Sequence, residues 1–324
     1  MLEEALNRMA QTVPSGFIDY KKVIEAVFNP NPQLPCTELY KGGSTKVYRV
    51  DTPELLVVRI ASGDKDYYEF QAELLEAIAD DDDITPRVLH WEMREIDNQI
   101  CGIQIQTYLP GAPLDHYPHP IESRAIVKAT YALHERLCAV SSRFGSKGIP
   151  TVDEVAKNLL ATVDDCPMKE AGGRLLEDKR YNELAAQEHY LIYGDLWHRN
   201  LLFDHASEET RVRIVDIDPL IFGPKILQPA ILFSSYFLVS SLLYASDNSH
   251  TFDLNEVIGY WPEPLNQQDV LLMMQVFPIM LGLHKAYQFA HDPSVDPTAY
   301  QSNMKLLMKC LQVIWEWGDS SGTT

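Results

Sequence analysis

The fold of this chain is set by the stretch Leu191-Ile-Tyr-Gly-Asp195-Leu-Trp-His-Arg-Asn200-Leu-Leu-Phe203, which is followed by Arg213-Ile-Val-Asp216. An Asp and an Asn stand five positions apart, and a second Asp ends the next apolar segment. Phosphoryl transfer needs a base or orienting group at the acceptor hydroxyl and oxygen ligands for the metal ions that bridge the phosphates. Asp195 suits the first role, and Asn200 and Asp216 suit the second. The spacing therefore predicts Mg-dependent phosphoryl transfer.

The same spacing is found in the catalytic loop of protein kinases, H-R-D-x-x-x-x-N, and the downstream Asp corresponds to that of D-F-G. Gly194 stands where protein kinases have Arg, and Tyr-Gly-Asp-Leu-x-x-x-Asn with Ile-Val-Asp resembles the aminoglycoside phosphotransferase-like (choline kinase-like) small-molecule kinases. That family usually has a Gly seven residues after its metal-binding Asp. Gly223 stands at that distance from Asp216, which favours Asp216 as the metal ligand and leaves Asp218 as a second candidate.

Two positions depart from the family's usual pattern. Tyr193 replaces the usual His, and Gln228 stands twelve residues after Asp216, where an Asp is common. Neither departure removes a phosphate or metal ligand. Each motif alone would fit an ordinary turn or strand end. Their order, the apolar strands around them and their separation of about twenty residues together favour the kinase interpretation.

The N-terminal half has the pattern of a nucleotide-binding lobe. Residues 38–50 form a strand, a glycine turn and a second strand, with Gly42, Gly43, Ser44 and Thr45 at the turn. Paired glycines between strands are usually an ordinary hairpin. The resemblance implies a phosphate-binding loop here, because the family often has Gly-Gly-x-x-Asn at this point.

A third strand over residues 55–60 carries Arg59 where the kinase template has the Lys that contacts the α- and β-phosphates. Arg is permanently charged and binds phosphate well, although its geometry differs from that of Lys. An Arg on an exposed strand face is the alternative. The sequence therefore predicts a phosphate contact for Arg59.

The helix expected over residues 66–79 should supply a carboxylate partner for Arg59. Glu69 and Glu73 are the candidates, and Glu73 is the first choice. The apolar positions of this helix nevertheless place Gln71 nearer to their stripe at helical spacing. Both carboxylates would equally suit a solvated helix face, so the choice stays open.

Strands over residues 88–95 and 99–107 complete an antiparallel sheet of about five strands. A Pro-Gly step at Pro110 then ends the strand-rich half of the chain. In kinase-like folds the hinge backbone pairs with the adenine edge, so the resemblance implies main-chain contacts from Gln106 to Tyr108. A plain strand-to-helix linker would contain the same residues.

After the hinge, helical patterns dominate, beginning with residues 121–140. Two apolar runs, residues 226–245 and 270–283, are expected to be buried core helices. The first run has about the length of a bilayer, but it contains Gln, Pro and four Ser. We therefore expect no membrane span.

These elements predict an α+β, two-lobed protein-kinase-like fold. The small antiparallel-sheet N-lobe would occupy residues 1–107, with a helical extension over residues 1–35, and the larger, mainly helical C-lobe would occupy residues 108–324. The resemblance implies that ATP or GTP binds with Mg²⁺ between these lobes. A small-molecule acceptor completes the expected set of partners.

Composition limits the class of protein further. The five cysteines are scattered and form no C-x-x-C pair, and the N-terminus lacks a basic-then-apolar signal, so we expect a reducing, cytoplasmic location. The net charge of −19 disfavours a nucleic-acid polymer as partner and favours a cationic acceptor. The histidines show no zinc spacing, and His134 is expected to be a packed residue.

The acceptor itself does not follow from the fold, because kinases for antibiotics, choline, homoserine and sugars share it. An aminoglycoside-type antibiotic, and hence a role in antibiotic resistance, is the first expectation. A metabolic small-molecule kinase is the second, and protein phosphorylation is the third. The competing class is a non-catalytic nucleotide-binding regulator, motivated by Arg59 and Tyr193. The intact Asp195, Asn200 and Asp216 argue against it.

Overall fold

The computed structural model divides the chain into two compact units, Met1–Pro110 and Gly111–Thr324. Several residues singled out above lie outside the described part, namely residues 1–18, the turn residues Gly42, Gly43 and Ser44, and Asp218. The described residues are 19–29, 32–41, 45–63, 65–79, 83–96, 98–113, 123–145, 148–163, 166–197, 199–204, 210–217, 220–239, 242 and 253–321.

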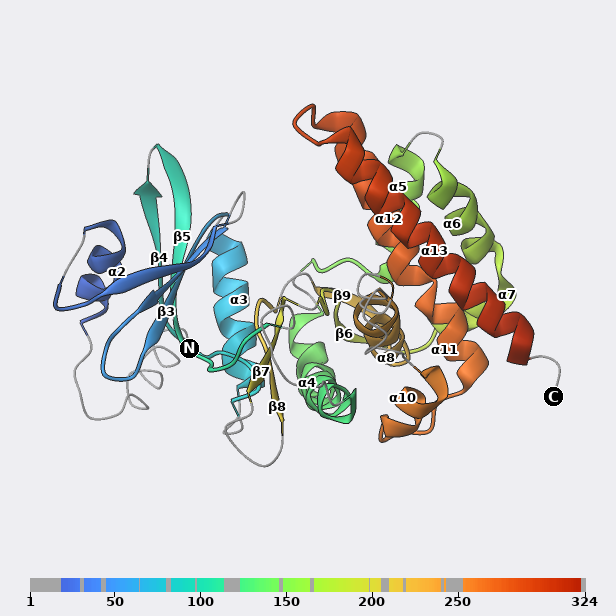
Figure 1. Cartoon of the computed structure of the whole chain (residues 1–324), viewed down its shortest axis with the longest axis horizontal. Helices are drawn as coiled ribbons and strands as arrows, with labels where there is room; N and C mark the ends of the chain where they lie inside the picture. The colour runs from blue at the N-terminus through green and yellow to red at the C-terminus, as the bar shows by residue number, and fades with distance from the viewer. Residues whose placement is uncertain are drawn as a thin grey trace. The chain divides into compact units, whose positions relative to one another are not determined.

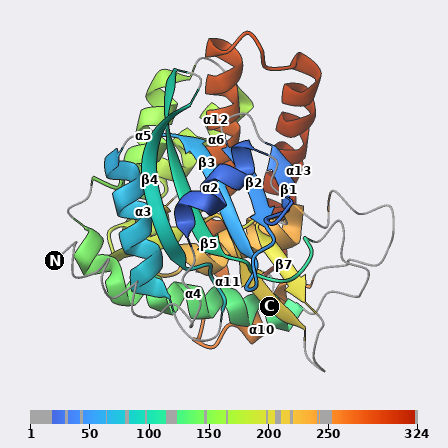
Figure 2. The same cartoon turned by 90° about the vertical axis from the view of Figure 1, so that its left-hand side faces the viewer.

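The N-terminal unit contains a five-stranded antiparallel sheet in the order β1-β2-β3-β5-β4, with β4 and β1 at its edges (Figure 2). The prediction of about five antiparallel strands is therefore confirmed. The strands are β1 (Cys36–Lys41), β2 (Thr45–Val50), β3 (Leu56–Ser62), β4 (Val88–Ile96) and β5 (Gln99–Thr107).

Helices cover both faces of this sheet (Figure 1). Because side chains alternate along a strand, Val58 and Ile60 of β3 point to the face that packs against α2 (Tyr20–Phe28). On the other face, α3 (Lys65–Ile78) places the Tyr68 ring over Gly102. A Cβ atom on Gly102 would lie 2.1 Å from that ring, so only glycine allows α3 to approach this closely.

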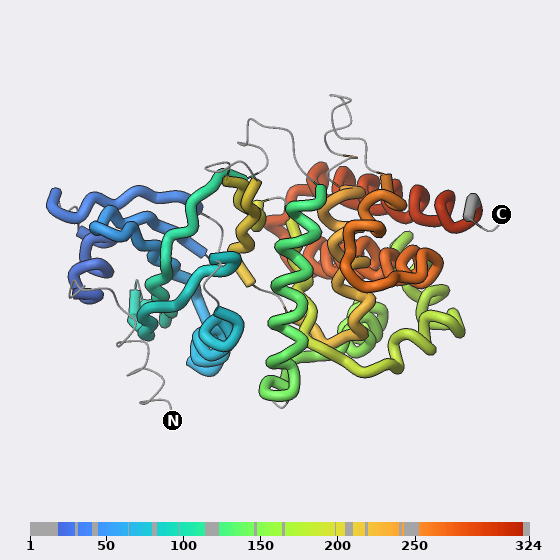
Figure 3. Tube along the Cα trace, turned by 90° about the horizontal axis from the view of Figure 1, so that it is seen from below, coloured from blue at the N-terminus to red at the C-terminus, as the bar shows by residue number. Residues whose placement is uncertain are grey.

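Most of the C-terminal unit is helical, as expected. Two small antiparallel sheets of two strands each are present: β6 (His189–Tyr193) pairs with β9 (Leu220–Pro224), and β7 (Leu201–Asp204) pairs with β8 (Arg211–Ile214). Helix α4 (Ser123–Phe144), green in Figure 3, packs against β6 and β8. The remaining helices are α5 (Val152–Thr162), α6 (Pro167–Glu177), α7 (Lys179–Ala185), α8 (Leu227–Ile231), the π-helix η2 (Leu232–Leu238), α10 (Leu254–Tyr260), α11 (Gln267–Met274), α12 (Val276–His291) and α13 (Pro297–Ser321).

Both apolar runs form helices in this unit. Residues 227–238, which form α8 and η2, are all buried, so the expectation of a buried helix is confirmed there. The second run spans two helices, because α11 ends and α12 begins on either side of Gln275.

One described helical stretch, Gln267–His291, is long and apolar enough to cross a membrane by length and composition alone, with a mean hydropathy of 1.4. Of that stretch's most apolar window, 56% is buried inside the protein. It also contains Asp269, whose carboxylate accepts two hydrogen bonds from Arg180. Core helices of soluble proteins meet the same criterion, so the length and hydropathy of this stretch are weak evidence for a span.

Candidate active site

Asp195, Asn200 and Asp216 lie on neighbouring loops of the C-terminal unit. Strand β6 ends two residues before Asp195, β7 begins directly after Asn200, and β8 ends two residues before Asp216. The Val215 N–H donates to the Asn200 carbonyl over 2.9 Å, which joins the two loops next to Asp216. The structure therefore brings the three predicted residues together.

The loop from Asp195 to Asn200 is folded back on itself. The Trp197 N–H donates to the Asp195 carbonyl (2.8 Å), and the Asn200 N–H donates to the Trp197 carbonyl (2.9 Å). The buried hydroxyl of Ser235, in η2, lies 2.7 Å from the Ile231 carbonyl and 3.0 Å from the Leu196 carbonyl, so its one proton is shared between its own helix and this loop. These backbone turns return Asn200 to the side chain of Asp195.

The Asn200 amide faces three acceptors. Its Nδ2 lies 2.9 Å from Asp195 Oδ2, 3.0 Å from the Asp195 carbonyl and 3.2 Å from the Tyr193 hydroxyl oxygen. A carboxylate and a carbonyl only accept hydrogen bonds, so the NH₂ group must face them and Oδ1 must face the other way. Oδ1 is consequently the Asn200 side-chain atom that could bind a cation.

Asp216 has an exposed side chain and a backbone φ of 57°. This left-handed conformation is uncommon for a residue other than glycine, and it costs about 1–2 kcal/mol. The Asp216 carbonyl accepts a hydrogen bond of 3.0 Å from the Tyr193 hydroxyl, which helps to hold this conformation. Hard divalent cations bind oxygen, so the Asp216 carboxylate and the Asn200 amide oxygen are chemically suited to Mg²⁺.

Tyr193 and Gln228, the two departures from the family pattern, are in direct contact. Gln228 Oε1 accepts from the Tyr193 N–H over 2.8 Å, and Gln228 Nε2 donates to the Tyr193 carbonyl over 3.1 Å. Both side chains are buried. Sequence reasoning identified the two positions separately and missed their contact, because they are 35 residues apart.

In the N-terminal unit, Thr45 is the first residue of β2 and Arg59 lies in the middle of β3. Arg59 is half-buried and stands directly opposite Gln104 of β5, so the two side chains share the sheet face that α3 covers. Gln104 is fully buried and accepts a hydrogen bond from Gln106 Nε2 over 3.1 Å. Tyr108 is half-buried and follows the end of β5.

Helix α3 presents Gln71 to this face of the sheet. Gln71 is buried, and its Oε1 accepts from Gln104 Nε2 over 3.3 Å, which confirms that Gln71 lies on the apolar stripe. Glu73 is half-buried and, two positions further along, points about 200° away around the helix. Glu69 forms an ion pair with Lys65 at 3.1 Å. The pairing of Arg59 with Glu73 stays a prediction.

The sequence matches the family described as "Phosphotransferase enzyme family" over residues 36–224, which is more than half of the chain. The chain belongs to this phosphotransferase family. No curated protein sequence matches it significantly.

Similar solved structures agree with this assignment. A thermostable mutant of aminoglycoside phosphotransferase APH(4)-Ia, in a ternary complex with AMP-PNP and hygromycin B, has 16% identity and a TM-score of 0.63, covering 91% of this chain and 96% of that chain. A microcompartment-associated aminopropanol kinase has 15% identity and a TM-score of 0.59, covering 94% and 99%. A choline/ethanolamine kinase family protein from Mesorhizobium loti has 16% identity and a TM-score of 0.59, covering 97% and 95%. The predicted kinase-like fold is confirmed.

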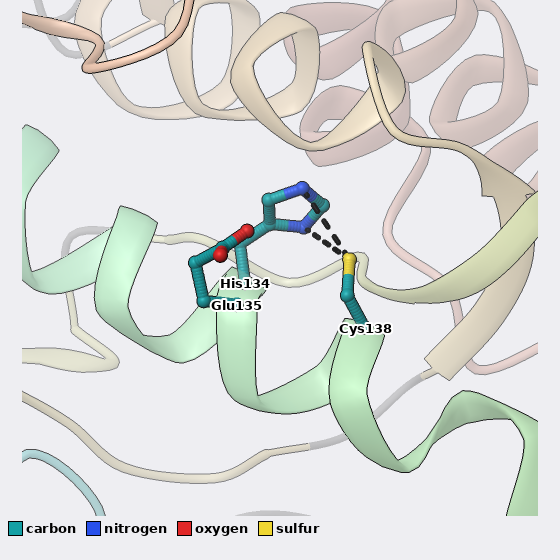
Figure 4. Close-up of side chains that lie close together, drawn as sticks. All are labelled: His134, Glu135 and Cys138. Carbon is teal, nitrogen blue, oxygen red and sulfur yellow. Dashed lines mark hydrogen bonds between the residues drawn. The ribbon is translucent and has the colours of Figure 1, made fainter.

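One group of side chains in this phosphotransferase has the composition of a metal site. His134, Glu135 and Cys138 project from α4 with their ligand atoms within 4.8 Å of one another (Figure 4). Cys138 Sγ lies 3.6 Å from both His134 ring nitrogens, so it is not aligned with the lone pair of either one. Tetrahedral zinc lies about 2.0–2.3 Å from its nitrogen and sulfur ligands, and the 3.6 Å separation is compatible with those distances. His134 is buried, as expected for a packed residue.

Burial also shifts the pKa values of His134 and Cys138. Burial, assisted by the charge of Lys225, lowers the pKa of His134 to about 4. Burial raises the pKa of Cys138 to about 12. Without a metal ion, the pair therefore consists of a neutral imidazole and a neutral thiol at pH 7.

A cavity of about 610 Å³ lies between α6, α7, α11 and α13 of the phosphotransferase. Its walls include Trp315, Arg174 and the ion pair of Arg180 with Asp269. None of the predicted catalytic or metal-binding residues lines it. This cavity is therefore separate from the candidate active site.

Proposed function

We propose that this phosphotransferase is a Mg-dependent kinase that transfers the γ-phosphate of ATP or GTP to a hydroxyl group of a small cationic molecule. An aminoglycoside-type antibiotic is the first candidate acceptor, and a metabolic amino alcohol is the second. The observation that carries the proposal is the juxtaposition of Asp195, Asn200 and Asp216, with the amide of Asn200 turned so that Oδ1 faces away from Asp195.

In the proposed reaction, Asp195 accepts the proton of the acceptor hydroxyl as its oxygen attacks the γ-phosphorus. A new O–P bond forms, the bond from the γ-phosphorus to the β-phosphate oxygen breaks, and the nucleoside diphosphate leaves with the electron pair. Asp195 is half-buried, and one of its oxygens already accepts from Asn200. This bond fixes the carboxylate for its proposed role of orienting the hydroxyl.

Asn200 Oδ1 and the Asp216 carboxylate would hold Mg²⁺. When bound, the metal ion neutralises charge on the β- and γ-phosphates. The hydrogen bonds of the Asn200 NH₂ group turn Oδ1 away from Asp195, and the Tyr193 hydroxyl holds the left-handed backbone at Asp216. Such preorganisation lowers the barrier, because the ligands need not reorient during the reaction.

In the N-terminal unit, we assign the phosphate contacts to Arg59 and to the turn from Gly42 to Thr45. Main-chain contacts from Gln106 to Tyr108 would bind the adenine edge. The assignment of Arg59 is supported by its position in the centre of β3, opposite the buried Gln104.

The cationic acceptor is supported by two observations. The net charge of the chain is −19, and an acidic protein attracts cations and raises their rate of encounter. In addition, the three similar proteins are an aminoglycoside phosphotransferase in complex with hygromycin B, an aminopropanol kinase, and a choline/ethanolamine kinase family protein. All of these compounds combine a cationic nitrogen with a hydroxyl group, which is the chemistry we propose for the acceptor.

The test is to incubate the purified protein with Mg-ATP or Mg-GTP and a panel of aminoglycosides, amino alcohols, choline, homoserine and sugars. Nucleoside diphosphate release and product mass are measured, with Asp195→Asn as the control that should lose transfer. A phosphorylated aminoglycoside or amino alcohol supports the proposal and identifies the acceptor. Bound nucleotide without transfer to any member of the panel contradicts the proposal and favours a nucleotide-binding regulator.

A further inference from the structure

We propose that Tyr193 is a positioning residue whose hydroxyl couples Asn200 to Asp216, and that Gln228 holds Tyr193 in place for this purpose. This inference deepens the proposed function and rests on it, because it concerns the two residues assigned to Mg²⁺.

The Tyr193 hydroxyl lies between the two loops of the site. Its oxygen accepts from Asn200 Nδ2 at 3.2 Å, and its proton is donated to the Asp216 carbonyl at 3.0 Å, with the Val215 carbonyl slightly further away at 3.3 Å. A phenol has one proton, so the hydroxyl accepts from one metal-ligand residue and donates to the other. Tyr193 is 0% exposed, so its side chain does not contact bulk solvent.

The hydroxyl acts on a different part of each residue. For Asn200 it adds a third acceptor on the NH₂ side, which disfavours the flipped amide and keeps Oδ1 on the cation side. For Asp216 it holds the backbone carbonyl while φ is 57°. Rotation of that peptide group would move the carboxylate, so one hydroxyl stabilises the position of both ligand oxygens.

Gln228 holds Tyr193 through its main chain. An amide side chain has both an acceptor and a donor, and Gln228 uses both on the N–H and carbonyl of Tyr193. A carboxylate at this position has only acceptors at neutral pH and could not donate to that carbonyl. Gln228 is 1% exposed and lies in α8, whose neighbouring side chains are also buried.

The two departures from the usual family pattern therefore form one structural unit. A tyrosine reaches across to Asp216 with its hydroxyl, and a glutamine fixes the peptide groups that direct it. Because one residue holds the other, substitutions at the two positions should not be additive.

The test uses Tyr193→Phe, which removes only the hydroxyl. We expect the Mn²⁺ affinity of the protein with a non-hydrolysable nucleotide, measured by electron paramagnetic resonance, to fall about tenfold, equivalent to about 1.4 kcal/mol. Nucleotide affinity without metal should not change. Where transfer is detected, the Mg²⁺ concentration for half-maximal activity should rise by a similar factor.

Tyr181→Phe is the matched control. Tyr181 is also fully buried, and its hydroxyl donates to Asp153 over 2.8 Å, between α7 and α5. Its removal should lower stability similarly but leave metal affinity at the wild-type value. Equal metal affinities for wild type, Tyr193→Phe and Tyr181→Phe would overturn the proposal.

Gln228→Met provides a second test, since it keeps a similar length and removes both the donor and the acceptor that contact Tyr193. We expect weaker Mn²⁺ binding in this variant. When it is combined with Tyr193→Phe, the Mn²⁺ affinity of the double variant should be little lower than that of either single variant. Additive losses would refute the coupling, and this test remains available if Tyr193→Phe does not fold.

Wild-type protein that binds metal and nucleotide without phosphorylating any acceptor would refute the kinase proposal alone, because the metal readout does not need transfer.

Discussion

Replacing Asp195 by Asn separates its proposed chemistry from its structural role. In the wild-type protein, Asp195 Oδ2 accepts from Asn200 Nδ2 over 2.9 Å. An Asn at position 195 can keep this bond by turning its own oxygen towards Asn200. Its NH₂ group then takes the place of the second carboxylate oxygen, and an NH₂ group cannot accept the proton of an acceptor hydroxyl.

The expected magnitudes follow from these contacts. A hydrogen bond to a charged group contributes about 1.5–3 kcal/mol and a neutral one about 0.5–1.5 kcal/mol, so Asp195→Asn should destabilise the fold by only about 1 kcal/mol. Asp195→Ala removes the bond and should cost about 1–3 kcal/mol. A general base contributes typically about 10²–10⁴-fold to the rate. Both variants should therefore lose at least about 100-fold in kcat, despite their different stabilities.

The assay compares kcat, nucleotide affinity and urea unfolding for the wild type and both variants. We expect nucleotide affinity to change little, since Asp195 is assigned to the acceptor. If Asp195→Asn kept kcat within about tenfold of the wild type while Asp195→Ala lost it, Asp195 would act only by positioning Asn200. That result would refute its assignment as the base.

Two further predictions concern stability. Gly102→Ala should lower the free energy of unfolding by about 1–3 kcal/mol, because its Cβ would lie 2.1 Å from the Tyr68 ring. In the control variant Gly173→Ala, in α6, the added Cβ meets no atom within 4 Å, so this variant should be neutral or stabilising. Equal melting temperatures for the two variants would contradict this packing. Burial lowers the pKa of His134 from 6.5 to about 4 in the folded protein. Between pH 6.5 and pH 4 the unfolded chain therefore binds more protons than the folded one. The free energy of unfolding should fall by up to about 3 kcal/mol as the pH drops from above 6.5 to 4. Urea unfolding of wild type and His134→Gln at pH 7.5 and 4.5 measures this loss, and an identical pH dependence in both proteins would show that His134 is not responsible.

Local patterns were sufficient to predict the sheet of the N-terminal unit. In β3, Leu56, Val58 and Ile60 alternate with residues of the opposite face, and the burial follows that alternation. Apolar side chains that recur at every second residue specify both a strand and its buried face without reference to the rest of the chain. The partner of Arg59 on α3 was not predictable in this way. The same helix carries both Gln71 and Glu73, and only the packing of α3 against the sheet shows which of the two faces β5.

The spacing of Asp195, Asn200 and Asp216 specifies the kinase-like chemistry that we propose, because the residues lie within one short stretch of strands and turns whose local geometry is constrained. Their orientation depends on contacts between distant parts of the chain. Tyr193 bonds to Asp216, 23 residues away, and to Gln228, 35 residues away. Hydrogen bonds need donor and acceptor within about 3 Å and aligned, and only the packing of β6 against α8 and the loop after β8 meets that condition. Sequence spacing therefore identifies the reactive groups, whereas tertiary structure decides which atoms they present.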